Sequence, residues 1–328
     1  MSAPGLCWGI IGAGFIAGKF VNAVAKRSAA SSVVAVGSRD RDKAASWAAE
    51  QGVPTAHGSY RELVDDPAVQ AVYVATPHVF HLEHALLAVR AGKPVLIEKP
   101  IAVSAEQART LAKAAADAGV FAMEAMWTRF LPHMTALRSL VAAGEIGELV
   151  HVHAEHSQHF PYDPAHRLYN PHLAGGALLD LGVYPLALVQ DLLGRPTQVA
   201  AVGALTETGV DGQASLAMRH GDRAQSTVST SMWGLSAISA QILGTDGRIT
   251  FDGPFLRPTT LRLETRAGKQ HSFDGEARNG FQFEVDEVAR CVADGRTESA
   301  VLPLDDSIAT LEVIDQARSA LGVRYPFE

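Results

Sequence analysis

Three side chains in this 328-residue sequence could together do acid–base chemistry on an alcohol. Lys99 follows an apolar run at residues 94–97, and Asp180 and Tyr184 stand four residues apart in the segment Gly-Gly-Ala-Leu-Leu-Asp-Leu-Gly-Val-Tyr-Pro. A helix would place Asp180 and Tyr184 on one face, although Pro185 must kink or restart that helix. A neighbouring ammonium lowers the pKa of a tyrosine from its ordinary value of about 10, which suits Tyr184 to proton transfer with a carbonyl oxygen. The structural alternative makes Lys99 a surface residue, Asp180 a helix cap and Tyr184 an interface aromatic.

A glycine-rich loop near the start of the sequence predicts a dinucleotide site. Residues 12–17 read Gly-Ala-Gly-Phe-Ile-Ala, the G-x-G-x-x-A pattern, between an apolar run and a predicted helix. Gly12 permits a tight turn, and Gly14 lets the backbone approach a pyrophosphate that faces free N–H groups at the helix start. We therefore expect Gly12, Gly14, Phe15 and Ile16 to contact the cofactor.

The end of the second predicted strand bears on which dinucleotide is bound. NAD-binding units usually place Asp or Glu there for the ribose 2′-hydroxyl, whereas this sequence reads Gly-Ser-Arg-Asp at residues 37–40. Ser38 can donate a hydrogen bond, Arg39 can pair with a 2′-phosphate, and Lys43 could supply a second positive charge. NADP is therefore favoured, and NAD remains possible because an inward-turned Asp40 would restore that preference.

Two further loops stand where a doubly wound sheet binds its ligand, at the carboxyl ends of its strands. One reads Ala-Thr-Pro-His at residues 75–78 and the other Glu-Lys-Pro at residues 98–100. The residues of this region that we predict to line the cofactor site are Thr76, Pro77, His81, Glu98 and Lys99.

The elements that must position these residues alternate in the first half of the sequence. Apolar runs predict strands and amphipathic stretches predict helices, the last of them capped by Ser104 and stopped by Gly119. The strands are expected at residues 7–11, 33–36, 71–75, 94–97 and 120–123, and the helices at 15–25, 43–51, 82–91 and 104–118. Strands alternating with crossover helices predict a parallel, doubly wound α/β sheet.

Past residue 123 the pattern changes to successive strands joined by Gly/Asp turns. Strands are expected at residues 149–156, 198–206, 214–220, 224–232, 237–243, 248–251 and 261–263, and helices at 281–293 and 305–321. This spacing predicts an open, mainly antiparallel sheet in an α+β domain. We place a dinucleotide-binding Rossmann domain at residues 1–124 and a substrate-binding and dimerisation domain at residues 125–328. Alternating apolar positions such as Val199, Ala201 and Val228 predict that the uncovered sheet face meets a second copy.

Composition disfavours several other classes of protein. The chain is 47% hydrophobic and 19% charged, which is typical of a compact globule. A net charge of −7, a pI near 6.0 and the absence of any run of five Lys or Arg disfavour a nucleic-acid partner. Cys7 and Cys291 lack metal or disulfide spacing, and glycines interrupt the first apolar stretch before it could serve as a signal peptide or membrane span. We expect a cytoplasmic protein without a membrane partner.

Taken together, these motifs resemble the glucose-fructose oxidoreductase / inositol dehydrogenase (GFO/IDH/MocA) family of NAD(P)-dependent oxidoreductases. The segment Met-Glu-Ala-Met-Trp-Thr-Arg-Phe-Leu-Pro at residues 123–132 narrows the resemblance to the branch of dimeric dihydrodiol dehydrogenases and NADP-dependent D-xylose dehydrogenases. The resemblance implies that the family's lysine is Lys99, its acid/base tyrosine Tyr184 and its helical aspartate Asp180. It also implies hydride transfer between NADP and an aldopyranose such as D-xylose or D-glucose, or a trans-dihydrodiol, by a homodimer formed through the second sheet.

Departures from the family pattern and the residues near the expected site bear on the substrate. Many members, the inositol dehydrogenases among them, carry His at the position of Tyr184, which argues against inositol, and His78 stands where Asn is common. Trp127 could offer an apolar plate to a sugar face or aromatic diol, and Arg167 could donate to hydroxyls. Both could equally be structural, because a Trp-Thr-Arg turn at a domain junction often packs a hinge. The side chains from which we expect specificity are Trp127, Arg129, Phe160 and Arg167.

Three other interpretations stay open at this point. His151 and His153 would share one face of a strand and could ligate zinc, but the resemblance implies no metal and we predict none. A non-catalytic NAD(P)-binding regulatory protein would keep the glycine loop and lose Lys99 or Tyr184, both of which are present. A ketoreductase of a nucleotide-linked deoxysugar would need a basic cleft in the second domain, for which the candidates are Arg129, Arg138, His166 and Arg167.

Overall fold

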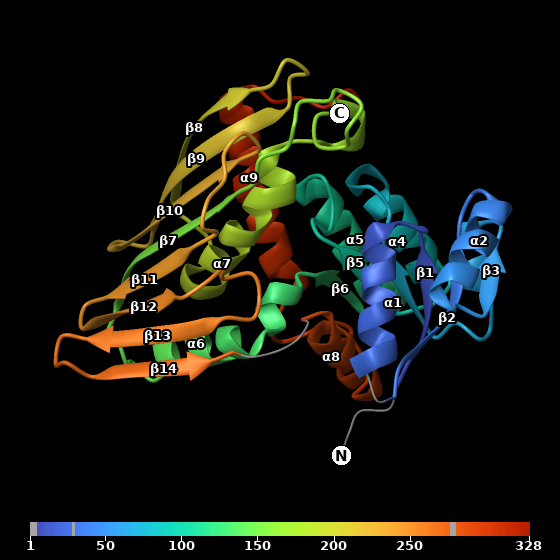
Figure 1. Ribbon diagram of the computed structural model, residues 1–328, viewed down its shortest axis with the longest axis horizontal. Coiled ribbons are helices and arrows are strands. Elements are labelled where there is room, and N and C mark those ends of the chain that lie inside the picture. Colours follow the sequence, from blue (N-terminus) through green and yellow to red (C-terminus); the bar gives the residue numbers. More distant parts are fainter. Residues whose placement is uncertain (1–4, 28–29, 276–279) are drawn as a thin grey trace. The chain divides into compact units, whose positions relative to one another are not determined.

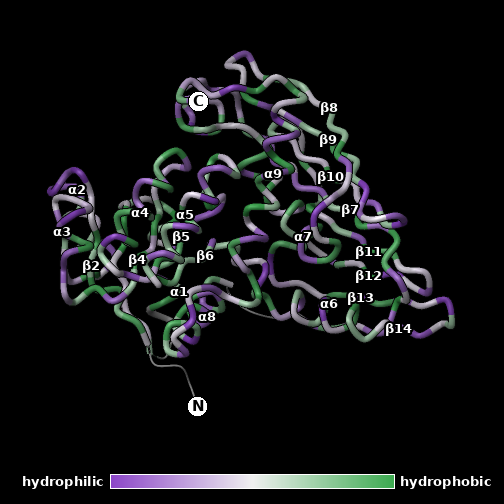
Figure 2. The backbone as a smooth tube through the Cα atoms, turned by 180° about the vertical axis from the view of Figure 1, so that it is seen from behind, coloured by the Kyte–Doolittle hydropathy of each residue, from purple (hydrophilic) through white to green (hydrophobic). Residues whose placement is uncertain are grey.

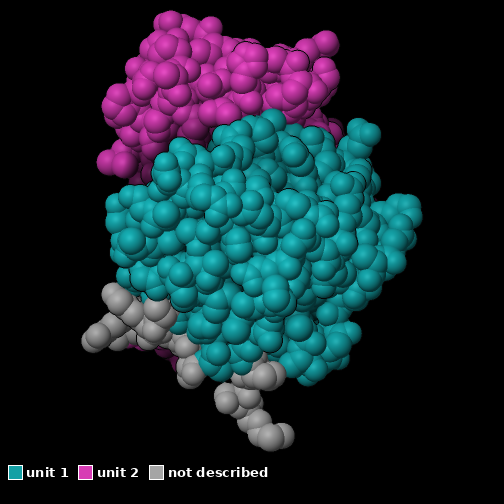
Figure 3. Space-filling view, turned by 90° about the vertical axis from the view of Figure 1, so that its right-hand side faces the viewer, with its two compact units in different colours: residues 1–127, 279–304 teal, residues 128–278, 305–328 magenta. Residues whose placement is uncertain are grey.

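The computed structural model describes residues 5–27, 30–275 and 280–328. The chain folds into two compact units, which Figure 3 colours separately. The first unit contains residues 1–127 and 279–304, and the second contains residues 128–278 and 305–328.

A six-stranded parallel sheet forms the centre of the first unit (Figure 1). Its strands are β1 (Cys7–Ile11), β2 (Ser32–Gly37), β3 (Thr55–His57), β4 (Ala71–Val74), β5 (Val95–Glu98) and β6 (Ala122–Ala125). They lie in the order β3-β2-β1-β4-β5-β6, and every neighbouring pair is parallel. The strand order changes direction between β1 and β4, the point at which such sheets bind their ligands. The prediction of a doubly wound parallel sheet is confirmed.

Helices cover this sheet and close its core. They are α1 (Phe15–Arg27), α2 (Arg41–Gln51), α3 (Tyr60–Asp65), α4 (His81–Arg90), α5 (Ala105–Ala118) and α8 (Phe281–Ala293), with a short 3₁₀ turn, η1 (His78–Phe80), before α4. The rings of Phe20 and Tyr73 stack with their centroids 3.9 Å apart, and both are fully buried with Trp8. α2 buries only Ala44 and Ala48, and much of its length is hydrophilic in Figure 2.

Local sequence signals set the ends of α5 as predicted. Ser104 precedes the helix in an extended conformation, and its hydroxyl accepts the N–H of Gln107 at 3.3 Å. Gly119 ends the helix in the left-handed region at φ +63°, a conformation that costs glycine no side-chain strain.

The second unit is built on an eight-stranded sheet in the order β14-β13-β12-β11-β7-β10-β9-β8. The strands are β7 (Leu149–Ser157), β8 (Gln198–Leu205), β9 (Asp211–His220), β10 (Ala224–Ser231), β11 (Ala240–Gly244), β12 (Gly247–Phe251), β13 (Thr260–Thr265) and β14 (Gln270–Asp274). Only β7 and β10 pair in parallel, so the prediction of a mainly antiparallel sheet is confirmed. Its helices are α6 (Pro132–Ala142), α7 (Val183–Leu193) and α9 (Leu304–Leu321), with the turns η2 (Trp127–Phe130) and η3 (Pro171–Leu173) and the π-helical η4 (Leu178–Gly182).

One face of this sheet is covered by α6, α7 and α9 (Figure 1). Ala201 pairs with Leu216, and Leu216 pairs with Val228, so the three residues share a face. Because Leu216 and Val228 are buried, this is the helix-covered face. The side chains of Val199, Ala201 and Val228 therefore face the helices, and the prediction that they meet a second copy is wrong. Successive side chains on a strand alternate between faces, so their neighbours along each strand lie on the opposite face. On the opposite face, Val202 is 72% exposed.

The division into units differs from the predicted boundary after residue 124. The first unit extends to residue 127, and residues 279–304, which we had assigned to the second domain, belong to it as well. The reason is that α8 packs against α1 and buries Val285 and Val288. The elements that were not predicted from the sequence are β3, α3, α6 and β14. Of these, β3 and α3 are short and β14 is polar.

Among the described residues, one helical stretch is long and apolar enough to cross a membrane. It spans Pro171–Leu193, with a mean hydropathy of 1.4 in its most apolar window. Since 83% of that window is buried inside the fold, the stretch has the character of a core helix.

Candidate functional site

The glycine loop of the first unit has the geometry that a dinucleotide needs. Gly12 lies at φ +104°, and a Cβ there would come within 3.0 Å of the Ala75 carbonyl oxygen, so both conformation and space require glycine. A Cβ on Gly14 would meet nothing within 4 Å, which leaves room beside the loop. α1 begins at Phe15 with no acidic residue in its first turn, so its N–H groups and dipole favour an anion such as a pyrophosphate.

The carboxylate of Asp40 is used by the protein itself. It caps α2, with Oδ1 accepting the N–H of Lys43 at 3.0 Å. The hydroxyl of Ser38 accepts the N–H of Asp40 at 3.3 Å. Arg39 is exposed, and its guanidinium carbon lies 5.9 Å from the ring centre of Phe80. The residue next to the expected ribose position is therefore a cation stacked on an aromatic ring.

Three residues around Arg39 were not identified from the sequence: Tyr60, Phe80 and His84. The rings of Tyr60 and Phe80 contact the His84 imidazole, with centroid distances of 4.5 and 5.8 Å. Burial and, to a lesser degree, Arg39 lower the pKa of His84 to about 4, so the imidazole is neutral near pH 7. Thr76 hydrogen-bonds His84 Nδ1 at 3.0 Å, which ties the predicted cofactor loop to this cluster. Because Tyr60 and Phe80 lie on elements with no dinucleotide motif, no sequence signal pointed to them.

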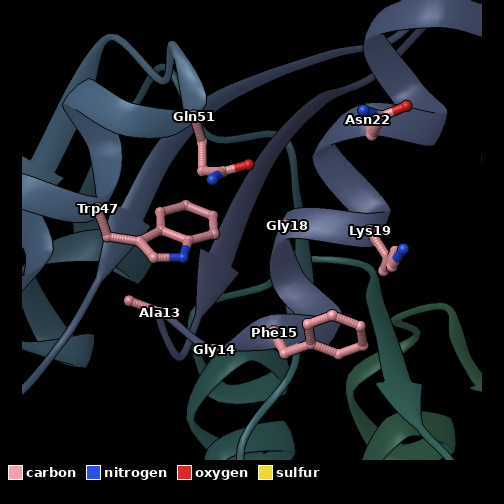
Figure 4. A pocket seen from close by; sticks show the side chains of 8 residues that line it. All are labelled: Ala13, Gly14, Phe15, Gly18, Lys19, Asn22, Trp47 and Gln51. Carbon is pink, nitrogen blue, oxygen red and sulfur yellow. The ribbon is translucent and has the colours of Figure 1, made fainter.

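A pocket of about 540 Å³ adjoins the glycine loop (Figure 4). Trp47 and Gln51 extend from α2 toward the side of α1 that carries Gly18. A Cβ on Gly18 would lie 3.3 Å from Gln51 Oε1, so this glycine keeps the groove between the two helices open. The complete lining is Ala13, Gly14, Phe15, Gly18, Lys19, Asn22, Trp47 and Gln51.

Glu98 ends β5, the strand that neighbours β4, and Lys99 follows it. Lys99 is half-buried, and its backbone N–H donates to Glu98 Oε2 at 3.2 Å. The Tyr73 hydroxyl donates to the other oxygen of the Glu98 carboxyl. Burial raises the pKa of Glu98 to about 7. Glu98, which we predict to contact the cofactor, is only 8% exposed, and its two hydrogen bonds fix the strand end from which Lys99 emerges.

His81 lies between two loops of the first unit. It is fully buried, and its ring nitrogens each lie 2.7 Å from a backbone carbonyl oxygen, Nδ1 from Pro100 and Nε2 from Thr76. Through these contacts His81 joins the loops that follow β4 and β5, and the predicted contact of His81 with the cofactor stays a prediction. Pro77 is exposed beside Thr76 in the first of these loops.

In the second unit, Asp180 and Arg167 form a bidentate ion pair. Arg167 Nη1 and Nη2 lie 3.0 and 3.1 Å from Asp180 Oδ1 and Oδ2. The Asp180 side chain is 7% exposed and that of Arg167 49% exposed, so the pair is buried at one end and open to solvent at the other. Arg167 was predicted as a substrate residue, and the structure shows that it also fixes Asp180.

Tyr184 lies in the first turn of α7, directly after the π-helical η4 that carries Asp180. Its ring meets the His156 imidazole edge to face at 5.5 Å. His156 Nδ1 donates to the carbonyl oxygen of Leu181 in η4 at 3.1 Å, and its Nε2 accepts from the Gln158 amide at 2.7 Å. His156 therefore supports both η4 and Tyr184. His156 was not identified from the sequence. It supports a π-helical turn, a geometry that is frequent at functional sites.

Two further residues are predicted to contact the substrate, Phe160 in the second unit and Trp127 in the first. Phe160 is half-buried, stacks on His166 at 5.9 Å and lies in the same loop as Arg167. Trp127 is the last residue of the segment 1–127 that belongs to the first unit. The Phe281 ring stacks on its indole, with a centroid distance of 5.2 Å.

Arg129, which we predict to contribute to specificity, is buried in the second unit. It is 6% exposed and pairs with Asp191 at 3.2 Å, with Asp306, and with the carbonyl oxygen of Ala187. Its donors therefore join η2, which carries Arg129, to α7 and α9 inside the second unit, and the substrate contact stays a prediction.

The two histidines considered as zinc ligands do share a sheet face, as predicted. His151 Nε2 and His153 Nδ1 lie 3.1 and 2.9 Å from the hydroxyl of Thr227, which joins them. Within residues 5–27, 30–275 and 280–328, no group of three or more His, Cys, Asp or Glu side chains is arranged to hold a metal ion.

Known proteins match the chain over both units. The family model for the oxidoreductase family with an NAD-binding Rossmann fold matches residues 6–126, and the GFO/IDH/MocA C-terminal domain matches residues 134–250. A trans-1,2-dihydrobenzene-1,2-diol dehydrogenase from Mus musculus is 36% identical over 335 residues, covering 98% of each chain.

Two solved structures share the fold along almost the whole length. A levoglucosan dehydrogenase in complex with NADH and levoglucosan has a TM-score of 0.87 at 21% identity and covers 97% of each chain. A mutant of a 3-ketoreductase from Actinomadura kijaniata, in complex with TDP-benzene and NADP, has a TM-score of 0.80 at 25% identity, over 97% of this chain and 98% of that one. With both domain models matched in order, and with the glycine loop, Lys99, Asp180 and Tyr184 all present, this chain belongs to the GFO/IDH/MocA family of oxidoreductases.

Proposed function

We propose that this enzyme transfers hydride between NADP and a CH–OH group of an aldopyranose or a trans-dihydrodiol. The observation that carries the proposal is the η4–α7 segment, which presents Tyr184 one turn after an Asp180 that Arg167 fixes by two hydrogen bonds. The dehydrogenase name of the 36% identical mouse relative supports a diol, and the levoglucosan complex supports a sugar as the substrate class.

Each proposed catalytic residue has a separate task. Tyr184 takes the hydroxyl proton during oxidation and returns it during reduction. Lys99 stabilises the phenolate and orients the reacting oxygen, while Asp180, oriented by Arg167, binds a neighbouring hydroxyl. The bound dinucleotide accepts or supplies the hydride.

The residues of the glycine loop and of the β2 end fit NADP. Gly12 and Gly14 open the loop, α1 directs N–H groups toward the pyrophosphate, and Arg39 is available to a 2′-phosphate because Asp40 is engaged as a helix cap. This arrangement supports NADP over NAD.

A substrate screen tests the proposal. NADP reduction is followed at 340 nm with D-xylose, D-glucose, trans-dihydrodiols and inositols, and repeated with NAD. We expect turnover with an aldopyranose or a dihydrodiol and none with inositols. Turnover of inositols alone would show that the substrate class is wrong.

A second candidate is reduction of a keto group on a nucleotide-linked deoxysugar. The 25% identical 3-ketoreductase bound to a TDP compound favours it, as does the exposed end of Arg167. Adding a TDP-linked 3-ketosugar and NADPH to the screen separates the two, because only the second candidate predicts turnover that requires the nucleotide.

A further inference from the structure

A buried carboxylate outside the proposed catalytic set lies at the start of the helix that carries Asp180 and Tyr184. Asp211 begins β9 and is fully buried. Its Oδ2 accepts the N–H of Leu178 at 2.6 Å, while its Oδ1 has no hydrogen-bond partner among the described residues. A buried carboxylate with an unsatisfied oxygen is costly, so its position requires an explanation.

The donor of that hydrogen bond identifies what Asp211 holds. Leu178 is the first residue of η4, which continues without interruption into α7 and carries Asp180 and Tyr184. The amino end of a helix has free N–H groups and a positive dipole end, and both favour a carboxylate. Asp211 therefore fixes the start of the segment on which the proposed chemistry depends.

The glycine pair before the helix is shaped around this contact. Gly176 lies at φ +123°, and a Cβ there would come within 2.2 Å of Asp211 Oδ1. A Cβ on Gly175 would come within 2.5 Å of the Leu168 carbonyl oxygen, in the loop that carries Arg167. The two glycines thus permit the close approach of the helix start to Asp211 on one side and to the loop of Arg167 on the other.

A second anchor holds the same turn from α9 and the residues after it. The buried Tyr325 hydroxyl donates to the carbonyl oxygen of Gly175 at 2.6 Å. Arg318 of α9 stacks on the Tyr325 ring at 4.0 Å and pairs with Glu328 at 2.6 Å. Tyr325 is therefore itself held in place by Arg318.

We propose that Asp211 is a positioning residue that, with Tyr325, fixes the start of the η4–α7 helix and thereby sets where Asp180 and Tyr184 lie. The inference rests on the proposed function, because the residues being positioned are its acid/base pair.

The strength of the hydrogen bond from the Leu178 N–H to Asp211 should depend on pH. Burial raises the pKa of Asp211 to about 7, against the effect of its backbone N–H donors and of Arg318. The other ionisable groups near it are Tyr325 and, around Tyr325, Glu328 and Asp315. A protonated carboxyl accepts weaker hydrogen bonds than a carboxylate, so the helix start loosens as the pH falls below about 7.

The test compares Asp211→Asn with Asp222→Asn, an exposed aspartate in the turn that follows β9. Hydrogen exchange of the full-length chain is followed by mass spectrometry over peptides covering residues 175–184. We expect exchange in this segment to be roughly tenfold faster in Asp211→Asn at pH 8, the scale of one hydrogen bond to a charged group, and unchanged in Asp222→Asn. Equal exchange in the two variants would overturn the proposal.

Activity supplies the second measurement. We expect Asp211→Asn to lower kcat by about 10-fold or more and to remove a fall in wild-type kcat below pH 7, with an unchanged Kd for NADP. An unchanged kcat and pH profile would show that Asp211 has a structural role only. If Asp211→Asn does not fold, Tyr325→Phe makes the same test, because it removes one hydroxyl from the same turn. If the wild type turns over no sugar or diol, the proposed function fails, while the exchange measurement still decides the positioning role.

Discussion

At the residue scale, one hydrogen bond decides what Asp40 can do. A carboxylate at the end of the second strand ordinarily serves the 2′-hydroxyl of NAD, but here its Oδ1 is committed to the N–H of Lys43. Arg39 next to it extends over Phe80 instead. The cation, and not the carboxylate, is therefore the group available to the cofactor.

Cofactor choice is the first prediction at this scale. Arg39→Ala should weaken NADP binding by roughly 1.5 to 3 kcal/mol, the scale of a charge-assisted hydrogen bond, and leave NAD binding almost unchanged. Fluorescence titration with each dinucleotide measures both values. Arg41→Ala is the control, because that exposed arginine pairs with Glu62. Equal losses for the two dinucleotides would show that Arg39 does not bind the 2′-phosphate.

The proton-transfer role of Tyr184 gives the second prediction. Tyr184→Phe keeps the ring against His156 and removes the hydroxyl, so kcat should fall by roughly 10² to 10⁴ with little change in NADP affinity. Tyr162→Phe serves as the control, since Tyr162 is 50% exposed. Turnover of Tyr184→Phe close to that of the wild type would remove the assignment.

Site residues can be predicted from the sequence only where they belong to a short, continuous motif. The glycine loop, Lys99 and the Asp180–Tyr184 spacing lie within short motifs: the loop joins β1 to α1, Lys99 follows β5, and Asp180 and Tyr184 lie in η4 and α7. Arg129 could not be assigned in this way, because its partner Asp306 lies 177 residues further along the chain. Burial against distant partners has no signature in a motif.

At the scale of elements, α8 carries an unusual buried carboxyl group. Glu284 is fully buried, and in the described part of the chain neither of its carboxyl oxygens has a hydrogen-bond partner. Burial, together with Glu98 and Glu124, raises its pKa well above the ordinary 4.5. The folded state therefore keeps Glu284 protonated at a pH where the unfolded chain does not.

This linkage predicts a pH-dependent gain in stability from Glu284→Gln. A raised pKa in the folded state contributes stability that is fully present below pH 4.5 and is lost as the pH rises. Because Gln needs no proton, the variant should be more stable than the wild type by about 1 to 3 kcal/mol at pH 8, and the difference should vanish near pH 4. Urea unfolding at the two pH values measures it, with the exposed Glu83→Gln as control. A loss of stability at pH 8 would contradict this account.

Element boundaries were predicted well where caps and periodicity agree, and poorly where polar strands lie at an edge. Phe281–Ala293 was predicted at its full length, whereas β14, with the sequence Gln-His-Ser-Phe-Asp, was missed. An edge strand needs few apolar side chains, because only one of its sides is paired. The π-helical geometry of η4 was also missed, since it depends on His156 from β7, which binds the Leu181 carbonyl.

At the scale of the whole molecule, the sheet of the second unit offers a surface for self-association. Ala200, Ala217, Thr227 and His153 form one row across β8, β9, β10 and β7 on the face opposite the helices. We expect this face to form a homodimer, so light scattering at micromolar protein should give twice the monomer mass.

A substitution in this row tests the assignment of the face. Ala217→Arg should lower the mass to that of a monomer, because it places a charge in the middle of the proposed interface. Asp222→Arg adds the same side chain in an exposed turn and should leave the mass unchanged. A monomeric wild type, or a dimeric Ala217→Arg, would contradict the proposed interface.

During biosynthesis, residues 279–304 of the first unit are made only after residues 128–278 of the second unit. The nucleotide-binding unit cannot be completed until α8 leaves the ribosome, although residue 127 is made far earlier. At a synthesis rate of about 5 to 20 residues per second, roughly 10 to 35 s pass between the synthesis of residue 127 and that of α8. During this time the side of α1 that meets α8 is uncovered. During that interval the unfinished chain is a natural client for a chaperone that binds exposed apolar helices.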